Sequence, residues 1–323
     1  MKKLISILTL IICLFCFPAC KKGGETLSVY APDGAPALAL AYSMKEVGEV
    51  SYNVVDSKVI KAKVTGENPL ADVAVVPINT ASLELGNGAV YQMLGVVTHG
   101  NFYFLSKLNK EINRDNISDL LGKTIGVVQL PNVPGLTLKV ALSGLGIEYN
   151  ELINNASPLM DKVNLLAITP NEIGVTPCDY YLAPSPVADI KAGVKSLNFV
   201  GSLHSLLLSG GFPQAVIVAK KSVLNANFDK VKEIVNAIKQ SGNYLKIQNK
   251  NEICSLINGN LEEGLTSVFN QNNLTENAIL RANINFVLAK DCKGEVNEFI
   301  QKLKAIKDDL SLFSEEFFYN GDF

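Results

Sequence analysis

The stretch LSVYAPDGAPALALAY (residues 27–42) places a strand, a tight turn and the start of a helix in direct succession. Leu27 to Ala31 is predicted to form a strand, and Pro32-Asp33-Gly34-Ala35 turns the chain into a helix. Pro36 suits the first helical turn, because the N–H that it lacks would have no helical partner there. A strand followed at once by a helix is the first half of the unit from which parallel sheets are built.

The same order of elements repeats further along the chain. A strand at 51–55 leads to a helical stretch near 58–64, and a strand at 72–76 leads to a helix opened by Asn79 and Thr80. Strands that alternate with helices predict a mostly parallel sheet with helices on both faces.

A second unit of the same kind starts after two extended runs at 90–97 and 101–106. The segment 118–128 is predicted to hold its first strand, which feeds the loop 129–133 before Pro134 opens a helix. Further predicted elements are strands at 163–168, 179–182, 197–200 and 214–220, a helix opened by Ser185-Pro186, and a mainly helical region from Asp229 onward. Two such sheets that face each other leave a cleft outside the carboxyl ends of their strands, where open α/β sheets bind ligands.

The composition is typical of a well-packed globular chain with two domains. Of the 323 residues, 48% are hydrophobic and 19% are charged, which excludes a disordered chain. Residues 1–19 hold two lysines and no acidic residue, so without them the formal net charge moves from −2 to −4. A mildly acidic body gives no indication of nucleic-acid binding.

Residues 1–20 have the pattern of an export signal. Lys2 and Lys3 precede an apolar run from Leu4 to Phe17, which is shorter than the roughly 20 residues that a membrane-spanning helix needs. Phe17-Pro18-Ala19-Cys20 resembles a bacterial lipobox in which Cys20 becomes the acylated first residue, although Phe17 and Pro18 depart from the usual residues. An ordinary secretory signal or an uncleaved anchor is the alternative. Each interpretation predicts a protein that works outside the membrane.

Three of the six cysteines lie beyond this signal region, at 178, 254 and 292. An odd number at wide spacing is a poor disulfide framework, so we expect three buried or idle thiols, although Cys254 and Cys292 could pair. The two histidines, His99 and His204, have no metal-ligand spacing around them, so no metal site is expected.

Several segments resemble the solute-binding proteins of ABC importers, in the branch with the type II periplasmic-binding fold that includes NMT1/THI5-like and sulfonate-binding proteins. The segments are LSVYAPDGAPALALAY (27–42), DVAVVPINT (72–80), SDLLGKTIGVV (118–128), NVPGLTL (132–138) and FPQAVIVAK (212–220). The runs RANINFVLA (281–289) and Phe317-Phe318-Tyr319 are similar to one subgroup of these lipoproteins. The resemblance covers essentially the whole mature chain, and it depends on the order and spacing of the segments rather than on one motif.

The resemblance implies an α/β fold of two domains, each a mixed, mostly parallel sheet flanked by helices, with a ligand cleft between them. It divides the chain into a signal peptide (1–19), a lipidated N-terminus and linker (20–25), a first part of domain I (26–100), domain II (101–200), and a second part of domain I with a helical C-terminal region (201–323).

In this fold the cleft receives the loops that end the strands. The expected ligand-binding residues are Asp33, Gly34, Ala35, Pro36, Asn79, Thr80, Asn132, Val133, Thr137, Ser185 and Phe212. Gly34 lets the backbone approach a ligand closely, and the free N–H groups at the helix start favour an anionic or polar acceptor. The amide of Asn79 and the hydroxyl of Thr80 can both donate and accept hydrogen bonds.

Each of these positions also has a purely structural interpretation that the sequence leaves open. Asp33 and Ser185 could cap the helices that follow them. Asn79 and Thr80 could cap their own helix in the same way. An aromatic strand residue such as Phe212 is more often part of a core than of a stacking site.

The predicted function is binding and release of a small organic solute for an ABC permease by an exported, lipid-anchored protein. The sequence has no nucleophile elbow, zinc motif or Gly-rich phosphate loop with Lys, so neither catalysis nor a cofactor is expected. We expect a monomer whose partners are a small solute, the permease and, through the lipid anchor, the membrane. Relatives commonly have Glu-Pro where this chain has Ser185-Pro186, so no relative's ligand is transferred.

Two other classes of protein compete with this prediction. The first is an enzyme with the same fold, of the pyrimidine-precursor or menaquinone-pathway kind; the export signal and the lack of a convergent acid/base set argue against it. The second is a surface adhesin or structural lipoprotein, which would have no deep cleft. Pyrimidine vitamin precursors, riboflavin-like rings and sulfonates all stay open as solutes.

Overall fold

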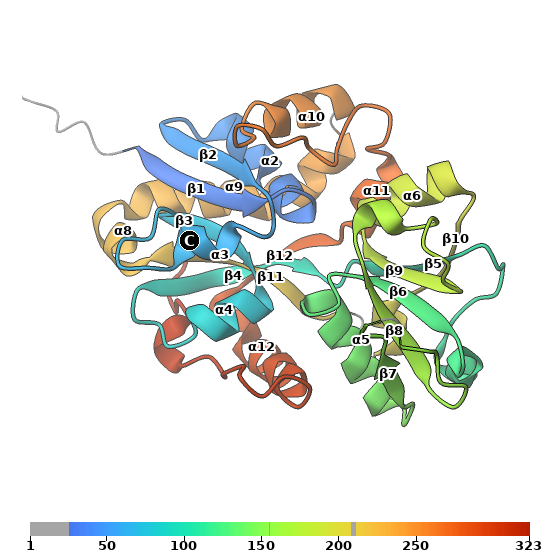
Figure 1. Ribbon diagram of the computed structural model, residues 1–323. Coiled ribbons are helices and arrows are strands. Elements are labelled where there is room, and N and C mark those ends of the chain that lie inside the picture. Colours follow the sequence, from blue (N-terminus) through green and yellow to red (C-terminus); the bar gives the residue numbers. More distant parts are fainter. Residues whose placement is uncertain (1–25, 155, 208–210, 248) are drawn as a thin grey trace, which may run out of the picture.

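The computed structural model describes residues 26–154, 156–207, 211–247 and 249–323, which form two lobes, each built on a six-stranded sheet (Figure 1). The predicted signal peptide, the linker and Cys20 lie outside the described residues. The two mixed sheets with their flanking helices confirm the predicted α/β fold class.

The first sheet has the strand order β12-β4-β11-β3-β1-β2. Its strands are β1 (Leu27–Pro32), β2 (Val50–Val55), β3 (Val73–Pro77), β4 (Tyr91–His99), β11 (Pro213–Lys220) and β12 (Ile284–Leu288). β1 pairs in parallel with β2 and β3, whereas β11 is antiparallel to both of its neighbours, β3 and β4. Successive residues of β11 face opposite sides of the sheet and are buried on both, which explains the continuous apolar run AVIVA.

The second sheet has the strand order β10-β5-β9-β6-β8-β7. Its strands are β5 (Phe102–Ser106), β6 (Thr124–Val128), β7 (Tyr149–Glu151), β8 (Val163–Ile168), β9 (Tyr180–Pro184) and β10 (Asn198–Ser202). β6 pairs in parallel with β8 and β9, and β5 is antiparallel to β9 and β10. Both lobes therefore combine parallel strands with antiparallel ones.

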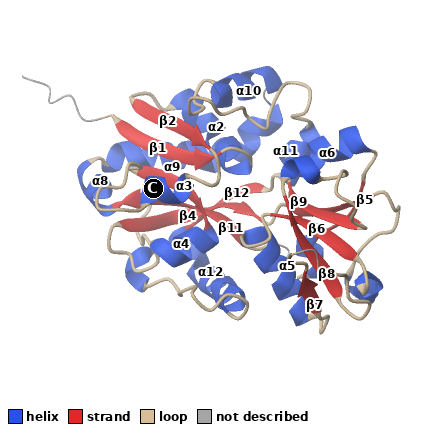
Figure 2. Cartoon of the chain, in the orientation of Figure 1, coloured by secondary structure: helices blue, strands red, loops and turns tan. Residues whose placement is uncertain are grey.

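Helices cover both faces of the sheets (Figure 2). They are α2 (Ala35–Glu46), α3 (Ile60–Val64), α4 (Ile78–Glu84), α5 (Val133–Gly144), α6 (Val187–Lys195), α7 (Leu203–Leu206), α8 (Lys221–Ala226), α9 (Phe228–Ile247), α10 (Lys250–Asn258), α11 (Glu276–Arg281) and α12 (Ala289–Lys304). Short 3-10 helices lie at Arg114–Leu120, Pro170–Glu172 and Glu315–Phe317. α2 and α9 pack together against one face of the first sheet, and α4 and α12 cover the other face. Across the described part of the chain, no helix is both long enough and apolar enough to cross a membrane.

The region after Asp229 contains one element that its helical pattern does not predict. Ile284–Leu288 forms β12, which pairs antiparallel with β4 at the edge of the first sheet. β7 also lacks a sequence prediction, because three residues at a sheet edge are too few to show a period. Both strands lie at the edge of a sheet and are defined by pairing with a neighbouring strand, so their local sequence carries little signal.

The chain passes between the lobes at two main points. β4 ends at His99 in the first sheet and β5 begins at Phe102 in the second, and the return runs from α7 to β11. Phe212 lies on this return and is only 2% exposed. Its ring stacks on Phe299 of α12 at a centroid distance of 5.2 Å and tilts against Phe102 at 5.7 Å. These three rings belong to one hydrophobic cluster that continues from the first lobe into the second.

Gly135, in the first turn of α5, allows a close backbone approach. A Cβ at this position would lie 1.9 Å from the carbonyl oxygen of Leu130, a backbone atom that no side-chain rotation can move. We expect Gly135→Ala to lower the free energy of unfolding by about 2 to 3 kcal/mol, in the upper part of the range for overpacking.

Gly144, at the other end of α5, provides the matched control, because a Cβ there meets nothing within 4 Å. Gly144→Ala should leave stability unchanged or raise it by up to about 1 kcal/mol through helix propensity. Urea unfolding followed by circular dichroism measures both variants. Equal effects of the two substitutions would contradict the assigned backbone contact.

Candidate ligand-binding site

Two hydrogen bonds join the lobes at loops that follow strands. The Asn79 Nδ2 donates to Asn132 Oδ1 at 3.4 Å, and the Gln129 Nε2 donates to Ser57 Oγ at 3.0 Å. Asn79 follows β3 and Ser57 follows β2 in the first lobe, whereas Gln129 and Asn132 follow β6 in the second. The structure thus brings together two residues, Asn79 and Asn132, that the sequence placed on opposite sides of the cleft.

Asn79 does not cap its own helix. α4 begins directly after Pro77, which is its N-cap residue and provides no side-chain bond, so the Asn79 amide remains free to point across the lobes. The Asn79 side chain is only 4% exposed, and its Oδ1 is buried with no partner among the described residues. A buried amide oxygen left unpaired costs about 1 to 3 kcal/mol, so this atom favours a hydrogen-bond donor. Thr80 is half-buried beside it.

Asn132 lies at the N-cap position of α5, and its side chain makes no capping bond to this helix. The side chain is exposed, and the turn that presents it is closed by the Asn132 N–H, which donates to the Gln129 carbonyl at 2.9 Å. Gln129 has φ +59°, a left-handed conformation that turns the chain directly after β6. The following Val133 and Thr137 are buried, and the Thr137 Oγ1 has no partner among the described residues.

The loop between β1 and α2 presents Gly34 with φ +108°, a conformation that favours glycine. Gly34 is the N-cap residue of α2 and offers no side chain, so Asp33 does not cap this helix, which was the structural alternative to ligand binding. The Asp33 carboxylate instead accepts hydrogen bonds from Gly34 N at 2.9 Å, Val268 N at 2.7 Å and Ser267 Oγ at 3.0 Å. Asp33 therefore fastens the 267–268 segment to the start of α2.

Burial raises the pKa of Asp33 above its ordinary value. The hydrogen bonds from Val268, Ser267 and Gly34 oppose this shift, and the negative charge of Asp56 adds to it. Ala35 is buried and Pro36 is half-buried in the same turn. The Gly34 N–H is bonded to Asp33 and the Gly34 carbonyl to the Leu38 N–H, so both the side chain of Asp33 and the backbone of Gly34 are engaged within the first lobe.

Ser185 is 1% exposed and lies at a contact between the lobes. Its Oγ is 2.6 Å from Asp189 Oδ2 and 3.1 Å from the carbonyl oxygen of Ala278 in α11. The expected capping role is wrong here too, because the N-cap residue of α6 is Pro186. The Phe212 ring is buried and packs against the rings of Phe102 and Phe299, so it is part of the core and its face is not exposed for stacking on a ligand.

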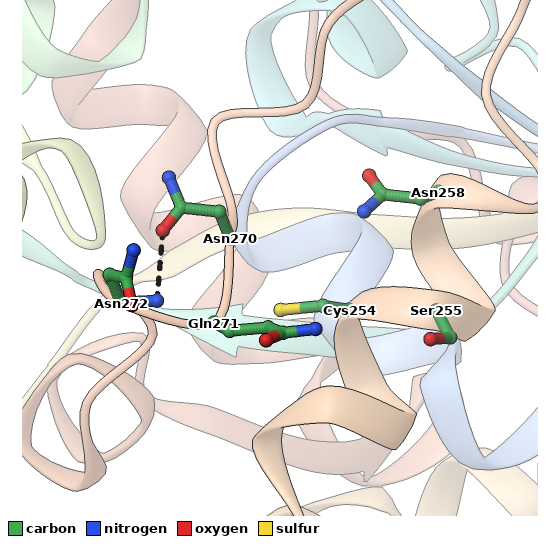
Figure 3. Close-up of a pocket in the computed structure, with 6 residues that line it drawn as sticks. All are labelled: Cys254, Ser255, Asn258, Asn270, Gln271 and Asn272. Carbon is green, nitrogen blue, oxygen red and sulfur yellow. Dashed lines mark hydrogen bonds between the residues drawn. The ribbon is translucent and has the colours of Figure 1, made fainter.

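Two cavities occur elsewhere on the described surface. One, of about 250 Å³, lies between α10 and the loop that follows it and is lined by Cys254, Ser255, Asn258, Asn270, Gln271 and Asn272 (Figure 3). The other, of about 340 Å³, is lined by Ser143, Gly146, Ile147, Glu148 and Tyr149 near the end of α5. Neither is lined by an expected ligand-binding residue.

The titratable groups near the crossings are shifted toward their neutral forms. Burial lowers the pKa of His99, opposed by a hydrogen bond to the Asn285 backbone, and lowers that of His204, opposed by one to the Gly100 backbone. Cys178, Cys254 and Cys292 are free thiols, as expected from their odd number and wide spacing, and Cys254 and Cys292 do not pair. Burial raises the pKa of Cys292 to about 12, so its thiol stays protonated and unreactive at neutral pH.

No protein-family model matches the chain in sequence, and no curated protein does. Solved structures do match its fold. An ABC transporter protein from Parabacteroides distasonis is 16% identical, with 92% of this chain and 100% of that one covered and a TM-score of 0.69. The periplasmic aliphatic sulphonate binding protein SsuA from Escherichia coli is 13% identical, with coverage of 93% and 95% and a TM-score of 0.58.

The ligand-binding component of an ABC-type import system from Staphylococcus aureus, with zinc bound, is 11% identical, with coverage of 90% and 97% and a TM-score of 0.57. At these identities the likeness concerns the fold. The chain therefore has the fold of periplasmic binding proteins, with two mixed sheets flanked by helices, and the structures similar to it include solute-binding components of ABC importers.

Because Asp33 binds the 267–268 segment to the start of α2, we expect its substitution to lower the free energy of unfolding by an amount that depends on pH. Asp33→Ala leaves the Val268 N–H without its acceptor, and we expect it to cost about 2 kcal/mol of unfolding free energy. Because the folded pKa is raised, the stability that Asp33 contributes is complete below the ordinary value of 3.8 and diminishes as the pH rises through the folded pKa.

Urea unfolding of the native protein and the variant at pH 3.5, 5 and 7 measures this difference. Asp308→Ala is the control, because Asp308 is exposed and is not among the groups that shift the pKa of Asp33. A stability difference between native protein and Asp33→Ala that grows with pH would refute the assigned burial of the carboxylate.

Proposed function

We propose that the protein is an extracytoplasmic solute-binding lipoprotein of an ABC importer, which captures a small organic molecule between its lobes and delivers it to a membrane permease. The observation that carries the proposal is the meeting of Asn79 and Asn132 from opposite lobes. It lies where strands of both sheets end, in a fold shared with ABC-importer binding components. Hinge closure around ligands is a known motion of periplasmic binding proteins.

In this proposal the direct hydrogen bonds to the solute come from the side chains of Asn79, Thr80 and Asn132. The backbone turn at Gly34, Ala35 and Pro36 lines the site beside them. The unpaired Asn79 Oδ1 accepts a hydrogen bond from the solute. Asp33, Val133, Thr137, Ser185 and Phe212 complete the site as the residues that shape and support it.

The proposed chemistry is binding rather than bond making. The structures similar to this chain include transport binding proteins, and the described histidines and cysteines are held neutral by burial. An enzyme of the pyrimidine-precursor or menaquinone-pathway kind would need an activated acid, base or nucleophile at the interlobe contact. The contact instead presents two carboxamides, which bind polar groups without exchanging protons.

The remaining parts of the proposal come from the sequence. Residues 1–19 act as a signal peptide, Cys20 carries the lipid, and residues 20–25 form the lipidated N-terminus and linker. The sequence divides the body into one domain of residues 26–100 and 201–323 and another of 101–200. Because β10 runs to Ser202 and α7 packs against α5 and β5, we extend the second domain to the end of α7. The protein is proposed to be a monomer of the NMT1/THI5-like kind. The lipid keeps this receptor beside its permease at the outer face of the membrane.

Native mass spectrometry of the purified protein tests the binding function, because a bound solute adds its mass to that of the chain. We expect a co-purifying small molecule that also raises the melting temperature of the emptied protein. Asn132→Ala should weaken this binding roughly tenfold, the equivalent of about 1.4 kcal/mol.

The matched control is Asn258→Ala, which removes an exposed carboxamide from the remote cavity of Figure 3. Solute affinity should be unchanged in this variant. If Asn258→Ala weakens binding and Asn132→Ala does not, the site lies in that cavity and the interlobe assignment is wrong. Turnover of the bound molecule would favour the enzyme.

The lipid anchor has its own test in cells. Cys20→Ala removes the only thiol that can be acylated at the proposed cleavage site, so we expect the protein to leave the membrane fraction and appear in the soluble extract. Immunoblots of the two fractions measure this change. Cys178→Ala, within the folded body, should stay with the membrane, and equal behaviour of both variants would contradict lipidation at Cys20.

A further inference from the structure

Helix α11 touches both lobes through different residues of its surface. Ile279 and Ala282 are buried in a cluster with residues of α2, α9 and α10, all of the first lobe. Ala278 and Arg281, one position earlier in each case, contact residues of the second lobe. Figure 1 shows α11 beside α6, on the side of the molecule away from α12. α11 is therefore a non-covalent bridge between lobes that the chain joins elsewhere.

An ion pair forms the centre of this bridge. The Arg281 Nη1 lies 2.5 Å from Asp189 Oδ1, and the Asp189 side chain is 6% exposed against 30% for Arg281. The second carboxylate oxygen of Asp189 is engaged by Ser185 Oγ at 2.6 Å. Because the carboxylate is almost fully desolvated, removing its cation leaves a buried charge unpaired, which is strongly destabilising for this arrangement.

Aromatic side chains fix the position of the guanidinium. The Arg281 Cζ lies 4.0 Å above the centre of the Phe199 ring, and Phe199 meets Tyr103 edge to face at 5.9 Å. The Tyr103 hydroxyl donates to the Arg281 carbonyl at 3.3 Å. A planar guanidinium suits this combination of stacking and ion pairing, which a lysine ammonium cannot reproduce.

The bridge lies next to the crossing between the lobes. Asn283, two residues after Arg281, bonds the His99 backbone in both directions: its side-chain amide donates to the His99 carbonyl, and the His99 N–H donates to the Asn283 carbonyl at 3.2 Å. When two lobes rotate about a hinge, a small shift at a contact beside the hinge corresponds to a large displacement far from it. The orientation of α11 on the second lobe is thus coupled to the distance between Asn79 and Asn132.

We propose that Arg281 is a positioning residue that holds the lobes in the conformation where Asn79 meets Asn132. The consequence of this inference for binding rests on the proposed function. If fewer molecules hold the conformation in which Asn79 meets Asn132, a solute that binds this conformation has a proportionally lower apparent affinity. Arg281 touches none of the proposed direct ligand contacts, and it acts on the site through the interlobe angle and through Asp189, which also holds Ser185.

Small-angle X-ray scattering of the unliganded, full-length protein without its signal peptide tests the proposal. We expect Arg281→Ala and Asp189→Asn to increase the radius of gyration, and Arg281→Lys to give an intermediate value. Hydrogen exchange near Asn79 and Asn132 should accelerate roughly tenfold, the equivalent of about 1.4 kcal/mol. Lys302→Ala, which breaks only an exposed pair with Glu298, is the control and should change neither.

Unchanged scattering and exchange in both Arg281→Ala and Asp189→Asn would overturn the proposal. If Arg281→Ala fails to fold by circular dichroism, Asp189→Asn decides, because it is isosteric and keeps an acceptor for Ser185. Neither measurement needs a solute. If Arg281→Ala is expanded but the native protein binds no metabolite, the bridge is supported and the transport function is refuted. If the native protein binds a solute but scattering is unchanged in the variants, the transport function is supported and the bridge is refuted.

Discussion

The position of β11 determines the rest of the architecture. This strand lies in the middle of the first sheet, pairing Val216 with Val76 of β3 on one side and with Val96 of β4 on the other. The chain between β4 and β11 builds the whole second lobe, so the first sheet is complete only after the chain has left and returned. The first passage, from His99 to Phe102, is short, and Pro213 at the start of β11 pairs with His99, so the chain leaves and re-enters the first sheet at neighbouring positions.

The candidate site follows from that constraint. Because the β3–α4 and β6–α5 turns come from different sheets, they are held opposite each other by the two crossings, by the shared aromatic cluster of Phe102, Phe212 and Phe299, and by the contacts of α11 with the second lobe. The contact between Asn79 and Asn132 is a single 3.4 Å bond between carboxamides, weak enough to be exchanged for bonds to a solute. The Arg281–Asp189 pair lies close to the hinge and has a desolvated carboxylate, so it is the stronger of the two interlobe contacts.

Sequence patterns predicted the elements whose neighbours lie close in the chain. The strand at Leu27, the Gly34 turn and the helical region that begins near Asp229 all have local periods or turn residues that define them. β12 and β7 escaped prediction because an edge strand depends on its partner. The carboxylate beside Ser185-Pro186 also escaped, because Asp189 lies one helical turn further on and its charge partner, Arg281, is distant in sequence.

By itself, the sequence determined the alternation of strands and helices and the polar residues at the ends of strands, since each depends on periodicity or on neighbouring residues. Only the tertiary structure decided which of those polar residues are free and which are already engaged. Asp33 is engaged by Val268 and Ser185 by Ala278, through pairings between distant segments. Asn79 keeps an unpaired oxygen because burial and the opposite lobe, not its own helix, define its surroundings.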